Sequence, residues 1–290
     1  MVRCVSATLA HSAPSRDLIA HHVELACVLE VSAAKPGNVS PGHDFTDMTY
    51  ADMVRSALAL GPVFARRRAR ARRVGQLIAD GVQATARVTR ANTNLGIVLL
   101  FAPLARAAVT QRRGEQLRAA TERTLAQLDL DDAAAAFAAI ARARPGGLGE
   151  VSEHDVRAPA RVSLREAMAA AAHRDSIASE YATGYAIVFD TGLRLLADAL
   201  RDGAGTLEAI VSLHLGLLAS HPDTLIVRKA GPAAARAVSV GAREVLAGDR
   251  SVDDFDASLR GGDRRLNPGT TADLVAATLL AALLSGVTLP

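Results

Sequence analysis

Residues 176–201 read SIASEYATGYAIVFDTGLRLLADALR, and this stretch decides the fold class. Its apolar or small residues recur every three or four positions, at Ile177, Tyr181, Tyr185, Val188, Gly192, Leu195 and Ala199. This spacing places them on one face of an α-helix, because such a helix has about 3.6 residues per turn. The stretch therefore predicts helical structure with one buried apolar face.

The rest of the chain repeats this pattern and contains almost no signal for β-strands. Of its 290 residues, 60 are alanine, the best helix former and a poor strand former, and only 3% are aromatic. Capping boxes mark several helix starts, among them Thr49–Asp52, Ser163–Glu166 and Ser251–Asp254. We therefore expect an all-α protein, a single compact domain over residues 1–290 with roughly ten helices.

Charge and hydropathy exclude several classes of protein. Lys and Arg number 33 against 30 Asp and Glu, and the net charge of +3 is too small to indicate nucleic-acid binding. The basic run Arg66–Arg73 contains no aromatic residue, which favours a solvated helix end over a surface that stacks bases. The longest apolar stretch, Leu274–Val287, is shorter than the about 20 residues of a membrane span and predicts a buried core helix.

The cysteines and the N-terminal residues predict a cytoplasmic protein. Cys4 and Cys27 form no C-x-x-C motif, so the sequence indicates neither a zinc ribbon nor a disulfide framework. Residues 1–20 contain no uninterrupted apolar segment of the kind found in signal peptides. A reducing compartment is therefore expected.

Four polar segments interrupt the helical pattern and carry the candidate binding residues. Long loops in a compact helical protein are often functional. The first, Lys35–Met48, combines prolines and glycines with one lysine and two aspartates. Lys35 can bind a phosphate as a point charge, and Asp44 and Asp47 can bind Mg²⁺. Alternatively, Thr46 and Asp47 serve only as caps of the next helix.

The other three segments combine cap residues with polar or charged side chains. Thr89–Gly96 precedes an apolar helix whose free N-terminal N–H groups suit an anion; alternatively, Asn92 or Asn94 serves only as a cap. Asp223–Lys229 contains the only other lysine of the chain, and Leu266–Leu274 is a turn that leads into a helix. We expect all four segments to line one cleft.

In this order, the segments resemble the motifs of the triphosphoribosyl-dephospho-CoA synthase family. The resemblance covers about residues 24–287, and its specificity lies in the order of motifs that are each weak alone. The matching residues are Lys35-Pro36-Gly37, His43, Asp47-Met48, Ser56-Ala57-Leu58, Asn92-Thr93-Asn94-Leu95-Gly96, Arg174-Asp175-Ser176-Ile177-Ala178-Ser179-Glu180-Tyr181, Asp223-Thr224-Leu225, Arg228-Lys229-Ala230-Gly231 and Asn267-Pro268-Gly269-Thr270-Thr271-Ala272-Asp273-Leu274. The resemblance implies an all-helical fold.

The resemblance also implies a transferase that moves the triphosphoribosyl group of ATP to the 2′-hydroxyl of 3′-dephospho-CoA and releases adenine. Mg²⁺ is the implied cofactor. The candidate catalytic residues are Asp47, Asp44 and His43. The candidate metal ligands are Asp44, Asp47 and Asp223. The candidate substrate- and phosphate-binding residues are Lys35, Asn92, Asn94, Arg228, Lys229, Asp175, Tyr181, Asn267 and Asp273.

The chain departs from the family pattern at three positions. Asn94 and Leu95 replace a His-Lys pair, and Leu225 replaces an asparagine. Two alternatives therefore stay open. One is a related enzyme that handles ribosyl or phosphate groups in pterin one-carbon cofactor biosynthesis, similar to the branch associated with tetrahydromethanopterin. The other is a non-catalytic helical binding protein with the Arg66–Arg73 run on an acidic partner. A homo-oligomer is compatible with either.

Overall fold

The computed structural model describes residues 16–143, 155–261 and 264–290, and in these ranges it is all-α. The first nine helices are α1 (Arg16–Ser32), α2 (Tyr50–Phe64), α3 (Arg66–Ala71), α4 (Val74–Ala86), α5 (Leu95–Thr110), α6 (Leu117–Ala126), α7 (Leu130–Ala143), α8 (Leu164–Ala171) and α9 (Ser176–Thr183). The remaining elements are the π-helix η1 (Ile187–Gly192), α10 (Leu193–Arg201), α11 (Thr206–Ser220), α12 (Thr224–Ala230), α13 (Pro232–Ala247), α14 (Val252–Leu259) and α15 (Gly269–Leu284).

The expected count of roughly ten helices is too low, because apolar periodicity does not reveal short breaks. Residues 176–201 form three elements, α9, η1 and α10. Gly184 ends α9 with a φ of +70°, a left-handed conformation that glycine adopts without steric cost. The periodic residues nevertheless reach the same core: the hydroxyls of Tyr181 and Tyr185 donate to the carbonyls of Leu99 and Leu100, at 2.6 and 2.8 Å.

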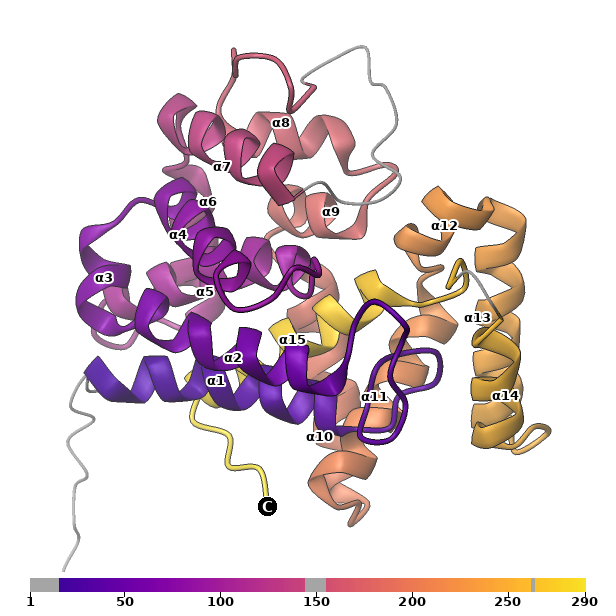
Figure 1. Cartoon of the computed structure of the whole chain (residues 1–290). Helices are drawn as coiled ribbons and strands as arrows, with labels where there is room; N and C mark the ends of the chain where they lie inside the picture. The colour runs from indigo at the N-terminus through magenta and orange to yellow at the C-terminus, as the bar shows by residue number, and fades with distance from the viewer. Residues whose placement is uncertain (1–15, 144–154, 262–263) are drawn as a thin grey trace, which may run out of the picture.

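Two helices form the centre of the molecule. Nearly every residue of α5 and α15 is buried, and a helix that is apolar on all sides belongs inside a core. In Figure 1, α15 runs between the group α1–α9 and the group α10–α14. The prediction of a core helix in Leu274–Val287 is confirmed, although the helix ends at Leu284.

The capping residues expected from the sequence start helices in the structure. The hydroxyls of Thr49, Ser163 and Ser251 accept hydrogen bonds from the backbone N–H groups three residues later. These bonds satisfy donors that a helix leaves free in its first turn.

The basic run forms a short helix, and the expected loops can be compared with the connections between helices. Residues Arg66–Ala71 form α3, and Arg68 and Arg72 lie within 4 Å of Asp80. The segment between α1 and α2 is a long connection that contains the Lys35–Met48 loop. Most of the expected loop at Arg144–Pro159 lies outside the described residues.

No single helix in the described ranges is long and apolar enough to cross a membrane. Only α11 and α12 together, which bend by 58° at their junction, reach the length and composition of a span.

Because of Glu180, we expect the free energy of unfolding to depend on pH. Its side chain is fully buried and accepts hydrogen bonds from the N–H groups of Ile187 and Val188, and burial raises its pKa to about 7. The folded state therefore holds this proton more tightly than the unfolded chain. The free energy of unfolding should fall as pH rises from about 4.5 to about 7, by up to about 1.4 kcal/mol per pH unit.

Denaturant unfolding of the wild type and of Glu180→Gln at pH 5 and pH 8 checks this expectation. The variant should lose most of the decrease, whereas Glu122→Gln, at an exposed position, should keep it. An equal decrease in wild type and Glu180→Gln would assign the pH dependence to other groups.

Candidate active site

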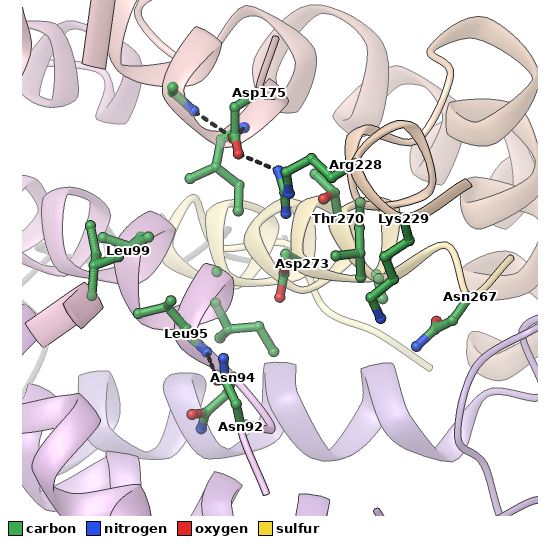
Figure 2. A pocket seen from close by; sticks show the side chains of 18 of the residues that line it. Asn92, Asn94, Leu95, Leu99, Asp175, Arg228, Lys229, Asn267, Thr270 and Asp273 are labelled. Atoms are coloured by element: carbon green, nitrogen blue, oxygen red, sulfur yellow. Dashed lines mark hydrogen bonds and ion pairs between the residues drawn. The ribbon is translucent and has the colours of Figure 1, made fainter. Parts of the chain in front are cut away.

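One cavity of about 1080 Å³ lies where α5, α9, α12 and α15 converge. Residues from each of the four polar segments line it, together with residues of α1, α7 and α8. In Figure 2, Asp273 lies between Asn92 and Asn94 on one side and Arg228 and Lys229 on the other. The cavity thus brings together side chains from both ends of the chain.

Cations gather at one wall of the cavity. Arg228 and Lys229, in the last turn of α12, and Arg264 all line it. Arg228 donates to Asp175 at 2.6 Å, and Arg264 pairs with Asp47. The pKa of Lys229 is lowered by burial and by the charges of Arg264 and Arg228. Two of the three cations are thus already paired, and their shared positive field favours an anionic ligand.

Asp223 does not serve as a metal ligand in this geometry. Its carboxylate is buried and does not line the cavity. One oxygen accepts the N–H groups of Leu225 and Ile226 at 2.8 and 3.0 Å. The other accepts the N–H and the hydroxyl of Thr271 at 2.7 and 2.8 Å. Burial raises the pKa of Asp223, and these hydrogen bonds oppose that rise.

Lys35 is a structural residue rather than a ligand of the cavity. Its side chain is 0% exposed, and its Nζ lies 2.9 Å from Oε1 of Glu30. It also donates to the backbone carbonyls of Glu30 and Ala33. Because its three N–H donors point to these acceptors at the end of α1, Lys35 cannot reach a phosphate in the cavity. The expected phosphate contact of Lys35 is therefore wrong.

The expected group of His43, Asp44 and Asp47 is only partly assembled. Of the three, Asp47 alone lines the cavity. Asp44 is exposed and accepts the N–H of Tyr50 at 2.6 Å, and His43 is exposed with Nδ1 3.3 Å from Ser40. Among the residues that the structure describes, no three His, Cys, Asp or Glu side chains come close enough to hold a metal ion. The three-aspartate metal site is not formed.

The polar residues near α5 and α9 divide into ligand-facing and structural ones. Asn92 and Asn94 line the cavity; Asn92 accepts the N–H of Leu95 at 3.3 Å, and Nδ2 of Asn94 is buried without a partner in the described chain. Asp175 lines the cavity and also caps α9. Tyr181 is fully buried and does not line the cavity, so its expected substrate contact is wrong.

Asp273 and Asn267 reach the cavity from the start of α15 and the turn before it. Oδ1 of Asn267 accepts a hydrogen bond from Asn38 at 2.7 Å. Asp273 lies against the first turn of α5, where a Cβ on Gly96 would be only 2.0 Å from its Oδ2. Burial, followed by the negative charges of Glu30 and other carboxylates, raises the pKa of Asp273 well above its usual range.

Several residues that line the cavity are not among those expected from the sequence. Glu30 from α1, Asn38, Phe45 and Arg264 all line it, with Arg264 stacked over the Phe45 ring at 5.0 Å. For Glu30 one signal was available: a carboxylate stands near the end of a helix just before Lys35, a cation that it can pair with. The remaining wall is apolar and comes mainly from α5, α7, α8 and α9, with Leu99, Phe137, Ile140, Ala167, Met168, Ala171 and Ile177.

Replacement of each lysine by methionine should affect a different property: stability for Lys35 and phosphate binding for Lys229. Lys35→Met should lower the free energy of unfolding by about 3–5 kcal/mol, because it leaves Glu30 as an unpaired buried charge. Lys229→Met should leave stability nearly unchanged and weaken the binding of inorganic tripolyphosphate severalfold. Denaturant unfolding and calorimetric titration measure the two effects. A stable Lys35→Met protein with weakened tripolyphosphate binding would restore Lys35 as a phosphate ligand.

Comparison with known proteins places the chain in a family. A curated protein of Stutzerimonas stutzeri (strain A1501), named "Probable 2-(5''-triphosphoribosyl)-3'-dephosphocoenzyme-A synthase", is 29% identical over 301 residues, which cover 95% of this chain and 94% of the relative. A crystal structure from Archaeoglobus fulgidus, named "putative triphosphoribosyl-dephospho-coA synthase", matches with a TM-score of 0.64 and 26% identity, over 80% of this chain and 99% of that one. The sequence pattern of the ATP:dephospho-CoA triphosphoribosyl transferases (CitG) matches residues 16–288. With nearly its whole length matched, the chain belongs to the family of ATP:dephospho-CoA triphosphoribosyl transferases.

Proposed function

We propose that this protein transfers the triphosphoribosyl group of ATP to the 2′-hydroxyl of 3′-dephospho-CoA, with release of adenine, and that the cavity is its active site. Family membership and the names of its relatives support the reaction. The observation that carries the proposal is the composition of the cavity, which has a cationic wall and an apolar wall in one space. Its volume of about 1080 Å³ is at the upper end for a single small ligand and suits two substrates.

The cationic wall is suited to the triphosphate. Arg228, Lys229 and Arg264 line the same part of the cavity, and Lys229 forms no ion pair with any described residue. A guanidinium binds phosphate oxygens through two parallel hydrogen bonds, and an ammonium binds them as a point charge. These three side chains would therefore hold the charged end of ATP while its ribose faces Asp273.

Magnesium would enter this site with the nucleotide. Of the three aspartates expected as metal ligands, only Asp47 lies on the cavity wall. The residues present therefore fit an ion that arrives with the nucleotide, not one that the protein binds alone. Mg²⁺ commonly binds one or two carboxylates together with substrate phosphates and water. When bound, it would neutralise part of the triphosphate charge, and Asp47 would supply an oxygen ligand in exchange for its contact with Arg264.

The apolar wall is suited to the pantetheine arm of dephospho-CoA. Phe137, Ile140 and Met168 offer a surface without charge, and apolar walls exclude the water that would compete with the acceptor hydroxyl. The arm carries no charge, so it can lie against this wall without the large cost of burying an ion. The acceptor would thus be oriented with its ribose toward the donor.

A second candidate is a related enzyme that acts on a different phosphorylated substrate, including one of pterin one-carbon cofactor biosynthesis. Its support is the position of the three departures from the family pattern, since Asn94, Leu95 and Leu225 all line the cavity. The non-catalytic alternative has no comparable support, because its Arg66–Arg73 run has contacts within the chain, such as Arg73 with Asp129. The cytoplasmic location and a homo-oligomer stay predictions.

Adenine release tests the proposed reaction directly. ATP, Mg²⁺ and dephospho-CoA together should yield free adenine by chromatography, whereas ATP and Mg²⁺ without an acceptor should yield almost none. Lys229→Met should raise KM for ATP by roughly tenfold, equivalent to about 1.4 kcal/mol of binding. Adenine release that requires a phosphorylated pterin instead of dephospho-CoA would favour the second candidate.

A bulky side chain in the apolar wall should affect only the acceptor arm. Ala171→Phe narrows that wall and should raise KM for dephospho-CoA by at least about tenfold, since displaced apolar contacts cost about 1–3 kcal/mol. ADP, used as the acceptor, carries the same ribose without the pantetheine arm. The KM for ADP should therefore not change. Ala172→Phe, outside the lining, is the matched control. Equal effects on dephospho-CoA and ADP would place the arm elsewhere.

A further inference from the structure

Glu30 lines the cavity and has a buried carboxylate oxygen without a partner among the described residues. The residue is 2% exposed, and its Oε1 is paired with Lys35 at 2.9 Å. Its Oε2 has no hydrogen-bond partner among the described residues, although Glu30 lines the cavity. A buried acceptor of this kind costs free energy unless a ligand satisfies it. Lys35 supplies the counter-charge at Oε1, so Oε2 is left without a hydrogen-bond donor from the described chain.

Asp273 lines the same cavity in a predominantly acidic surrounding. The charged groups that act on it are Glu30 of α1, Asp175 before α9, and Asp223 and Arg228 of the α12 region, of which only Arg228 is a cation. The charge of Asp273 acts in turn on Cys27 of α1. Burial and the three carboxylates raise the pKa of Asp273, and Arg228 opposes this. Burial also raises the pKa of Cys27, so its thiol stays neutral.

The two carboxyl groups therefore differ in what they can offer a substrate. Glu30, with its lysine partner, offers a proton acceptor. Asp273 has no paired cation of its own in the described chain, and burial and the neighbouring carboxylates favour its protonated form, which offers a donor. A carboxyl group paired with a cation and one placed among other carboxylates are suited to serve as base and acid of one reaction.

We propose that Glu30 and Asp273 are the acid–base pair of this enzyme: Glu30 removes the proton of the acceptor hydroxyl, and Asp273 protonates the departing purine. This proposal rests on the proposed function, since it concerns the same site. It assigns catalysis to α1 and α15, not to His43, Asp44 and Asp47 of the loop.

The proposed step conserves protons and electrons. The acceptor oxygen forms a bond to C1 of the ribose of ATP as the bond from C1 to N9 of adenine breaks. The electron pair of the broken bond stays on the purine, where the proton of Asp273 adds to a ring nitrogen. The hydroxyl proton passes to Oε2 of Glu30. Transfer of that proton from Glu30 to Asp273 restores the starting state, and the triphosphate takes no part in bond changes.

Gly96 allows the donor group to reach this position. A side chain there would overlap Oδ2 of Asp273, so the first turn of α5 needs a glycine for the carboxyl to enter the cavity. Nδ2 of Asn94, buried beside the same turn without a described partner, offers a hydrogen bond to the purine or to the hydroxyl.

The test compares two donors that differ in the leaving group. One is ATP; the other is p-nitrophenyl riboside 5-triphosphate, whose nitrophenolate departs without protonation. Asp273→Asn should slow adenine release from ATP by about 10²–10⁴-fold and nitrophenolate release by less than tenfold. Glu30→Gln should slow both, because both reactions require the acceptor proton to be removed. Asp198→Asn, at a surface ion pair, should change neither.

The pH profile gives a second measurement. In the wild type, adenine release should fall at high pH as Asp273 loses its proton, and Asp273→Asn should lack that decline in its residual activity. Thermal unfolding and ATP titration of each variant check that the fold and the binding of the donor are kept. If Asp273→Asn does not fold, Asp273→Glu replaces it, and this variant should keep the donor discrimination of the wild type.

Three results overturn the proposal. Equal losses with both donors in Asp273→Asn would remove its role as acid while leaving the proposed transfer intact. Recovery of Asp273→Asn or Glu30→Gln at high Mg²⁺ would make the pair metal ligands. A wild type that releases no adenine in the presence of dephospho-CoA would overturn the proposed function and this pair together.

Discussion

The Asp223 carboxylate is the contact on which the geometry of the site depends. It accepts two hydrogen bonds from the first turn of α12 and two from Thr271 in the first turn of α15. Charge-assisted bonds of this kind are strong and directional in a buried environment. They hold two helix starts together, and in consequence Arg228 and Lys229, one turn further along α12, lie on the same cavity as Asp273.

A second buried carboxylate, that of Glu30, fixes the part of the cavity at the end of α1. Glu30 and Lys35 neutralise each other at the end of α1, and the chain then turns into the long connection to α2. Removing one partner of such a pair is costly, which explains why this lysine is fully enclosed although lysines rarely are. Both ends of the cavity are therefore fixed by buried ionic contacts, those of Asp223 with two helix starts and that of Glu30 with Lys35.

The fold could be predicted much more fully than the site. Helical periodicity and cap residues such as Ser163 identify helices because both depend on neighbours three or four positions away. Local rules also gave the wrong number of helices, since a left-handed Gly184 and a π-helical segment keep the same apolar residues facing inward. For the site, motif order picked out segments that line the cavity, but it could not separate Lys229, which lines it, from Lys35, which does not.

The sequence by itself determined the all-helical class, the family and the four segments from which the cavity is built. These properties are encoded in periodicity, in composition and in short motifs read along the chain. Only the tertiary structure decided the role of each charged side chain. Burial and partners depend on residues distant in sequence, such as Arg228 with Asp175, or Asp273 with Gly96. A carboxylate that caps a helix and one that faces a substrate are the same residue type, and what distinguishes them is whether the packed chain has already supplied their hydrogen-bond donors.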